Sequence, residues 1–116
     1  MTDHIEKIVS KWGFERKEGG DAPRFERRYR DFHFIIKVYY DTINLFASSI
    51  SEDSRMFNDE LNLWIGDFRV ISPFIDDDNI DWWKLEWTMR NFIQTSINKF
   101  LNYDLFHDKE WKDGKD

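Results

Sequence analysis

The sequence predicts an α+β protein with an N-terminal helix, an antiparallel sheet of about three to five strands, and one or two C-terminal helices packed on one sheet face. Three observations predict this class. Apolar and polar residues alternate with a period of two through much of the first half, and helical periodicity occupies both ends. Aromatic residues make up 18% of the 116 residues, enough apolar area for one core. We therefore expect a single domain over residues 1–116, with a charged tail from about residue 104.

The first predicted element is an amphipathic helix over residues 3–12. Its apolar residues recur at i, i+3, i+4 and i+7: Ile5, Ile8, Val9 and Trp12. Thr2 is placed to cap its start and Gly13 to end it. This pattern is typical of a helix that packs on a sheet.

The strand block follows. Residues 14–18 predict a short strand, and the GGDAP sequence after it predicts a loop. The stretches 24–30, 32–40 and 43–48 then alternate, with these residues on one face: Phe25, Arg27 and Tyr29; Phe32, Phe34, Ile36, Val38 and Tyr40; Ile43, Leu45 and Ala47. Asp31 and Asp41 mark the turns. The sequence therefore predicts an antiparallel meander.

Residues 54–65 predict a second helix. Apolar residues recur there at helical spacing: Phe57, Leu61, Trp64, Ile65 and Phe68. The competing interpretation is another strand with Leu61, Leu63 and Ile65 on one face. Residues 67–75 predict a short extended segment, because Pro73 prevents a regular continuation.

The longest helix is predicted after the acidic run 76–78 and extends to about residue 101. Asp78 is the expected N-cap, with Asp81 three residues on. A broad apolar face predicts core packing: Trp82, Leu85, Met89, Phe92, Ile93, Ile97 and Phe100. A second stripe lies off that face and contains Trp83, Trp87, Arg90, Gln94 and Leu101.

The remaining C-terminal residues are expected to be too charged to form a core. Tyr103, Leu105, Phe106 and Trp111 could still pin part of this tail down.

Charge and composition restrict the classes of function. The net charge is −6, and its distribution is uneven: residues 1–40 carry nine Lys/Arg against seven Asp/Glu, whereas residues 41–116 carry eight against sixteen. An acidic part repels phosphates, so we expect no direct nucleic-acid binding and instead a partner with a basic surface. The chain has no cysteine, signal-peptide pattern or long apolar run, so we expect a cytoplasmic protein without a membrane span.

No catalytic or metal-binding motif is recognisable. The three histidines, His4, His33 and His107, belong to separate predicted elements and have no sequence-local partner. The acids from Asp76 to Asp81 lack the ligand spacing of a hand-type calcium loop. We therefore predict a non-enzyme without cofactor or metal; His33 clustered with acids in a concave pocket would favour an enzyme instead.

A basic concentration comprises Arg24, Arg27, Arg28 and Arg30, with Lys11, Arg16 and Lys17 nearby in sequence. Acids lie among these residues, so the pattern favours a solvated sheet face with cross-strand ion pairs over a nucleic-acid-binding strand. The tail acids Asp104, Asp108 and Glu110 are expected to be able to cover this patch.

The predicted partner-binding residues are Asp76, Asp77, Asp78, Asp81, Trp83, Trp87 and Arg90. Trp and Arg are enriched at binding hot spots, which is the basis for this prediction. The alternative is that Trp83 and Trp87 pack under the tail or against the second helix, because a large exposed apolar patch is rare in a monomer.

These features favour a small acidic binding protein that inhibits or regulates a larger partner. Counter-defence inhibitors of mobile elements such as phages, including anti-CRISPR proteins that occupy a basic nucleic-acid channel, have this general build, although no motif is shared. Two alternatives remain: an immunity protein that neutralises a toxin, and a self-assembling structural protein that forms a homodimer through the Trp stripe.

Overall fold

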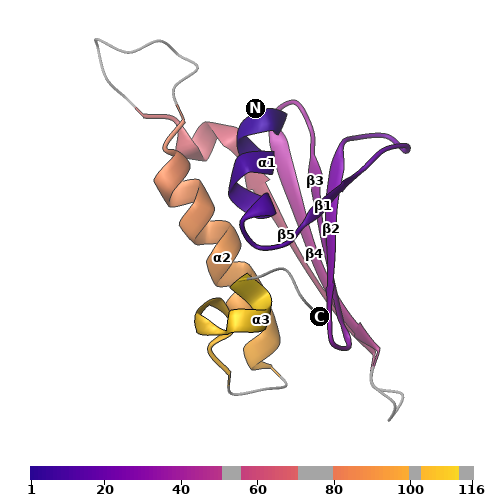
Figure 1. Cartoon of the computed structure of the whole chain (residues 1–116). Coiled ribbons are helices and arrows are strands. Elements are labelled where there is room, and N and C mark those ends of the chain that lie inside the picture. Colours follow the sequence, from indigo (N-terminus) through magenta and orange to yellow (C-terminus); the bar gives the residue numbers. More distant parts are fainter. Residues whose placement is uncertain (51–55, 71–79, 100–102, 113–116) are drawn as a thin grey trace.

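The computed structural model describes residues 1–50, 56–70, 80–99 and 103–112. Its elements, in chain order, are α1 (Thr2–Ser10), β1 (Glu15–Lys17), β2 (Arg24–Tyr29), β3 (Phe32–Val38), β4 (Thr42–Ile50), β5 (Met56–Trp64), the 3-10 helix η1 (Ile65–Phe68), α2 (Trp82–Asn98), the 3-10 helix η2 (Leu105–His107) and α3 (Lys109–Lys112). The predicted α+β class is confirmed (Figure 1).

The sheet is an antiparallel meander with the strand order β1-β2-β3-β4-β5. Two short turns set its register, and both fall where the sequence predicts them. Arg30 and Asp31 connect β2 to β3, with Arg30 at a φ of 55°. Tyr40 and Asp41 connect β3 to β4, where the Tyr39 amide donates to the Thr42 carbonyl at 2.8 Å.

One face of the sheet is buried by the helices (Figure 1). Burial alternates along β2, β3 and β4 as predicted, and the inward side chains are buried: Phe25, Arg27 and Tyr29; Phe32, Phe34, Ile36 and Val38; Ile43, Leu45 and Ala47. From α2, Leu85, Met89, Ile93 and Ile97 join the same core. Tyr40, assigned to this face from the alternation, is 97% exposed because it lies beyond the end of β3.

The prediction of a helix over residues 54–65 is wrong. Met56–Trp64 form β5 and pair with β4 over nine residues, from Thr42 opposite Trp64 to Ile50 opposite Met56. Leu61 and Leu63 face the core, as in the competing strand interpretation, whereas Trp64 is 53% exposed. The apolar spacing fits both periods, and pairing with β4 decides between them.

Both helix starts differ from the predictions. The N-cap of α1 is Met1 and not Thr2, although Gly13 ends the helical region at a φ of 78°, where glycine is favoured. The N-cap of α2 is Asp81, whose side chain accepts a hydrogen bond from the Lys84 amide at 3.0 Å. Asp78, the predicted cap, lies outside the described residues.

The segment predicted to be extended over residues 67–75 begins differently. Asp67 and Phe68 belong to η1, and the extended backbone starts at Arg69, which bridges to Ile80. Residues 71–79 lie outside the described part of the chain.

The tail is held down by the apolar residues that the sequence singled out: Leu105, Phe106 and Trp111 belong to the core, and Tyr103 packs against it. Leu105 and Trp111 are fully buried and Phe106 nearly so. The Trp111 ring meets Phe14, Tyr29, Phe34 and Phe106 edge-on, at centroid distances of 5.4–6.1 Å. A few apolar residues therefore hold this charged segment, because their side chains pack into the aromatic part of the core.

Candidate functional site

Two tryptophans stand on the outer surface of α2. Trp83 is 76% exposed and Trp87 is 56% exposed, one turn apart. The opposite side of the same helix is fixed in the core through Leu85, Met89 and Ile93. The alternative considered from the sequence was that these tryptophans pack under the tail or against a second helix, and the described residues bury neither ring in this way.

The stripe that contains these tryptophans is divided by the tail. Gln94 donates from Nε2 to the Tyr103 carbonyl at 2.6 Å and accepts from the Leu105 amide at 2.9 Å. One turn earlier, the Arg90 guanidinium lies over the Phe106 ring at 4.7 Å from its centroid. The tail thus covers the Gln94 end of the stripe and leaves the Trp83 and Trp87 end uncovered by the described residues.

A small cleft of about 120 Å³ lies where the two parts of the stripe meet. Its lining residues come from α2 and from the tail: Trp87, Arg90, Asn91, Gln94, Asp104 and Phe106. Asp104 is already engaged by His107 Nδ1 at 2.6 Å. The cleft therefore offers an aromatic wall and the exposed Arg90 guanidinium to a single side chain.

The acidic part of the predicted site is not brought together with the tryptophans in the described residues. Asp76, Asp77 and Asp78 lie outside them. Asp81 is used as the helix cap. The charged neighbours of Trp83 on α2 are Lys84, whose ammonium lies 5.6 Å from the Phe68 ring centroid, and Glu86, which is paired with Lys11 at 2.7 Å.

Arg27 is an element of the core that sequence analysis assigned to a solvated basic patch. Only 4% of it is exposed. Its guanidinium donates to the carbonyls of Trp12, Trp111 (2.7 Å) and Glu110 (3.3 Å), and it lies 4.0 Å from the centre of a Trp111 ring. The burial of Arg27 could have been predicted, because the period-two alternation of residues 24–30 places Arg27 on the same face as Phe25 and Tyr29.

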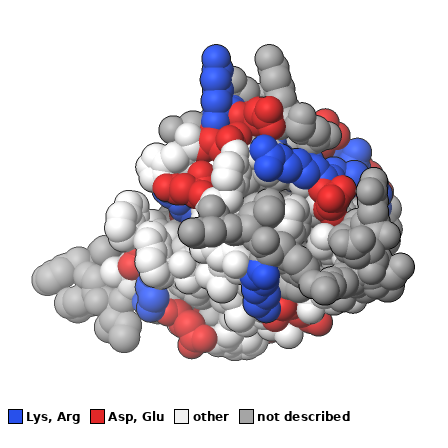
Figure 2. Space-filling view, turned by 90° about the horizontal axis from the view of Figure 1, so that it is seen from below, with Lys and Arg blue, Asp and Glu red and all other residues white. Residues whose placement is uncertain are grey.

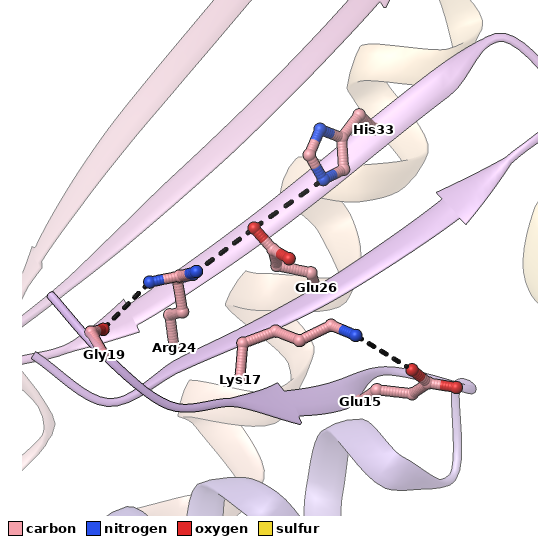
Figure 3. Close-up of polar contacts among 6 residues, drawn as sticks. All are labelled: Glu15, Lys17, Gly19, Arg24, Glu26 and His33. Carbon is pink, nitrogen blue, oxygen red and sulfur yellow. Dashed lines mark hydrogen bonds and ion pairs between the residues drawn. The ribbon is translucent and has the colours of Figure 1, made fainter.

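Several other basic residues of this region pair with acids, some within one strand and some between distant parts of the chain. Arg24 contacts Glu26 at 3.4 Å and Lys17 contacts Glu15 at 3.3 Å, each pair within one strand (Figure 3). The cross-strand pair in Figure 3 joins Glu26 to His33 at 3.9 Å. From the tail, Glu110 reaches Arg30 at 3.9 Å, so one of the three tail acids pairs with the basic patch as expected.

His33 does cluster with acids in a concave region. A cleft of about 320 Å³ on the outer sheet face is lined by Gly13, Glu15, Lys17, Glu26, Arg27, Arg28 and His33. This is the arrangement that would favour an enzyme. However, His33 Nε2 is 3.9 Å from Glu26, beyond a hydrogen bond, and the same carboxylate oxygen faces Arg24. The geometry is that of a charge-compensated sheet face.

The other histidines lie elsewhere. The His4 ring stacks on Trp82 at 3.8 Å, and His107 contacts Asp104. Within the described residues, no group of three or more His, Cys, Asp or Glu side chains is arranged to hold a metal ion.

Another cleft, of about 600 Å³ and lined by described residues, was not predicted from the sequence. It lies between the start of α1, the β3–β4 turn and η1, and its most exposed rings are Tyr40 and Trp64. Both were misassigned, Tyr40 to the inward face and Trp64 to a helix. A cleft formed by a turn and a strand end has no periodic signature that would reveal it.

Charges of both signs mix on the surface seen in Figure 2. Lysine and arginine side chains lie beside aspartate and glutamate side chains, with no continuous area of one sign among the described residues in this view. The excess of acids in the C-terminal two thirds of the sequence therefore does not produce a uniformly acidic face there.

Comparison of the chain with protein-family models, with curated proteins and with solved structures finds no match. Among the described helices, none is both long and apolar enough to cross a membrane.

Proposed function

We propose that this chain is a small binding protein that inhibits or regulates a larger protein, and that Trp83 and Trp87 form the centre of the contact. The observation that carries the proposal is the exposure of two indole rings on a helix whose opposite side is buried in the core. Large exposed rings are unfavourable in water, and clusters of them mark interaction surfaces in soluble proteins.

The rings are held on a rigid support. The inner side of α2 is packed in the core, and its first turn is capped by Asp81. Little backbone freedom is therefore lost when a partner binds, which favours affinity. Arg90, oriented by Phe106, and the small cleft beside Trp87 add a place for one partner side chain.

The net charge of −6 favours a partner with a basic surface. A nucleic-acid-binding enzyme has such a surface, and an anti-CRISPR-like inhibitor would present acids to it. Only three residues separate the acidic run 76–78 from the start of α2 in sequence, which is the reason to include Asp76, Asp77 and Asp78 in the proposed contact. Such a complex would weaken as salt screens the charges.

The test is a quantitative capture from the native host with three baits: the wild-type chain, Trp83→Ala/Trp87→Ala, and Tyr40→Ala. Tyr40 is the control, because it is an exposed ring on the β3–β4 turn and not on α2. We expect a partner that is retained by the wild type and Tyr40→Ala and lost by the double variant. Equal retention of that partner by all three baits would show that the tryptophans are not the contact.

The charge component is measured on the purified complex. Raising the salt concentration from about 0.05 to 0.5 M, and reversing Asp76, Asp77 and Asp78 to lysine, should each raise the Kd. A Kd that is unchanged by both treatments would remove the basic surface from the proposal.

A further inference from the structure

We propose that two copies of this chain associate through β5, pairing antiparallel edge to edge with the two-fold axis at Leu61. This surface is separate from the Trp83 and Trp87 contact, and the inference does not rest on the proposed function.

β5 is a long, regular sheet edge. It has nine residues, pairs with β4 without a bulge, and no described residue pairs with its other side. The opposite edge, β1, has three residues, all of them exposed and charged. Natural proteins protect sheet edges by shortness, charge or bulges, and by these criteria β1 is protected and β5 is less so.

The backbone groups available on β5 follow from the pairing with β4. The Ile65 amide donates to the Asp41 carbonyl at 2.8 Å, so Ile65 points toward β4. The direction of backbone hydrogen bonding alternates along an antiparallel strand. The backbone groups that point away from β4 therefore belong to Trp64 and to every second residue before Trp64. These are the N–H and C=O groups of Asn58, Glu60, Asn62 and Trp64.

The self-pairing register with its axis at Leu61 suits the side chains. With the axis at Leu61, Glu60 of each copy lies opposite Asn62 of the other, and the two Leu61 residues face each other in a close, non-hydrogen-bonded pair. Asp59 then lies opposite Leu63, and its charge is already compensated by Lys99 at 2.6 Å. An axis at Glu60 would instead place the two Glu60 carboxylates opposite each other.

The helical layer above β5 is compatible with this association. Thr88, Phe92, Thr95 and Lys99 follow one another at helical spacing on one stripe of α2, and Lys99 reaches Asp59 of β5. The other three residues of this stripe, Thr88, Phe92 and Thr95, are uncharged. Phe92 and Leu61 are only partly buried in the single chain, so a second copy would cover apolar surface in both layers.

A second copy fits better than an unrelated strand because this edge supplies its own complement. Each Glu60 acceptor meets an Asn62 donor, and this happens twice through the symmetry axis. The side chains of Glu60 and Asn62 are exposed on the sheet face away from the helices, so they can be changed without disturbing the core.

The test is sedimentation equilibrium of the full chain at about 1 to 100 µM. We expect a dimer for the wild type and a monomer for Asn62→Glu, which places Glu60 and residue 62 of the two copies in like-charge opposition. The double variant Glu60→Lys/Asn62→Glu should restore the dimer through two ion pairs. Lys17→Gln, which makes the same change in net charge on the β1 edge, should leave the dimer unchanged.

A wild-type chain that is monomeric at about 100 µM overturns the proposal, as does a dimer that Asn62→Glu leaves intact or a charge swap that fails to restore it. Trp83→Ala/Trp87→Ala separates this interface from the α2 surface. That variant should remain dimeric, and its conversion to a monomer would place self-association on α2 and contradict the β5 pairing.

Discussion

At the scale of single residues, Arg27 connects three parts of the chain that are distant in sequence. Its guanidinium binds carbonyls of Trp12 at the end of the α1 region and of Glu110 and Trp111 in α3, while its backbone belongs to β2. The last carbonyls of a helix lack donors within the helix, and a guanidinium with several N–H groups suits them. The buried charge is tolerated here because three backbone carbonyls accept hydrogen bonds from the guanidinium.

We expect Arg27→Met to lower the free energy of unfolding by about 3 kcal/mol, because hydrogen bonds to a charged donor are lost and buried carbonyls are left unpaired. Arg28→Met is the matched control, since Arg28 is the next residue on β2 and is exposed on the other face. It should change stability by no more than about 0.5 kcal/mol. Equal effects in urea denaturation would contradict the assigned role of Arg27.

His4 carries a pH dependence. The pKa of His4 is lowered below its ordinary value, first because burial disfavours the charged imidazolium and then because the Lys7 ammonium is nearby. The unfolded chain therefore binds this proton more readily, so the contribution of His4 to stability is complete above about pH 6.5 and is lost as the pH falls through its folded-state pKa. A histidine titration by NMR should give a pKa below about 6.5 for His4. A value at or above this would contradict the burial of the His4 ring and its proximity to Lys7 as the causes.

At the scale of elements, the alternating strands and the helical face of α2 could be predicted because their apolar residues follow one period only. β5 could not, because Leu61, Trp64 and Ile65 satisfy helical spacing while Leu61, Leu63 and Ile65 satisfy strand spacing. The deciding interaction is the pairing with β4, which is tertiary and leaves no local signal. The same reason explains why the exposure of Trp64 was not foreseen, whereas Tyr40 is exposed because β3 ends at Val38.

The N-cap of α2 tests the helix start directly. Asp81→Ala should lower stability by about 1 kcal/mol, because the Lys84 amide loses its acceptor. Asp81→Asn should retain most of this stability, since asparagine is an equally good N-cap. If Asp78→Ala proved more destabilising than Asp81→Ala, the helix would begin earlier than the structure places it.

At the scale of the whole molecule, one face of a five-stranded sheet carries α1, α2 and the tail, and the other is covered by no described helix (Figure 1). The candidate site could be predicted in part: periodicity identified Trp83, Trp87 and Arg90 as lying off the core face. Whether the tail covers Trp83 and Trp87 depends on how it packs, with Trp111 in the core and Tyr103 bound to Gln94 of α2. Periodicity does not reveal such long-range packing.

The central claim is that Trp83 and Trp87 are surplus to the fold and are therefore available for a partner. Its most direct test compares the unfolding free energies of Trp83→Ala/Trp87→Ala and Trp111→Ala in the same denaturant. We predict that the double variant stays within about 1 kcal/mol of the wild type, as expected for two surface sites. Trp111→Ala, which removes a fully buried indole, should lose about 3–5 kcal/mol. A double variant that loses as much as Trp111→Ala would place both rings in the core and contradict the proposed contact.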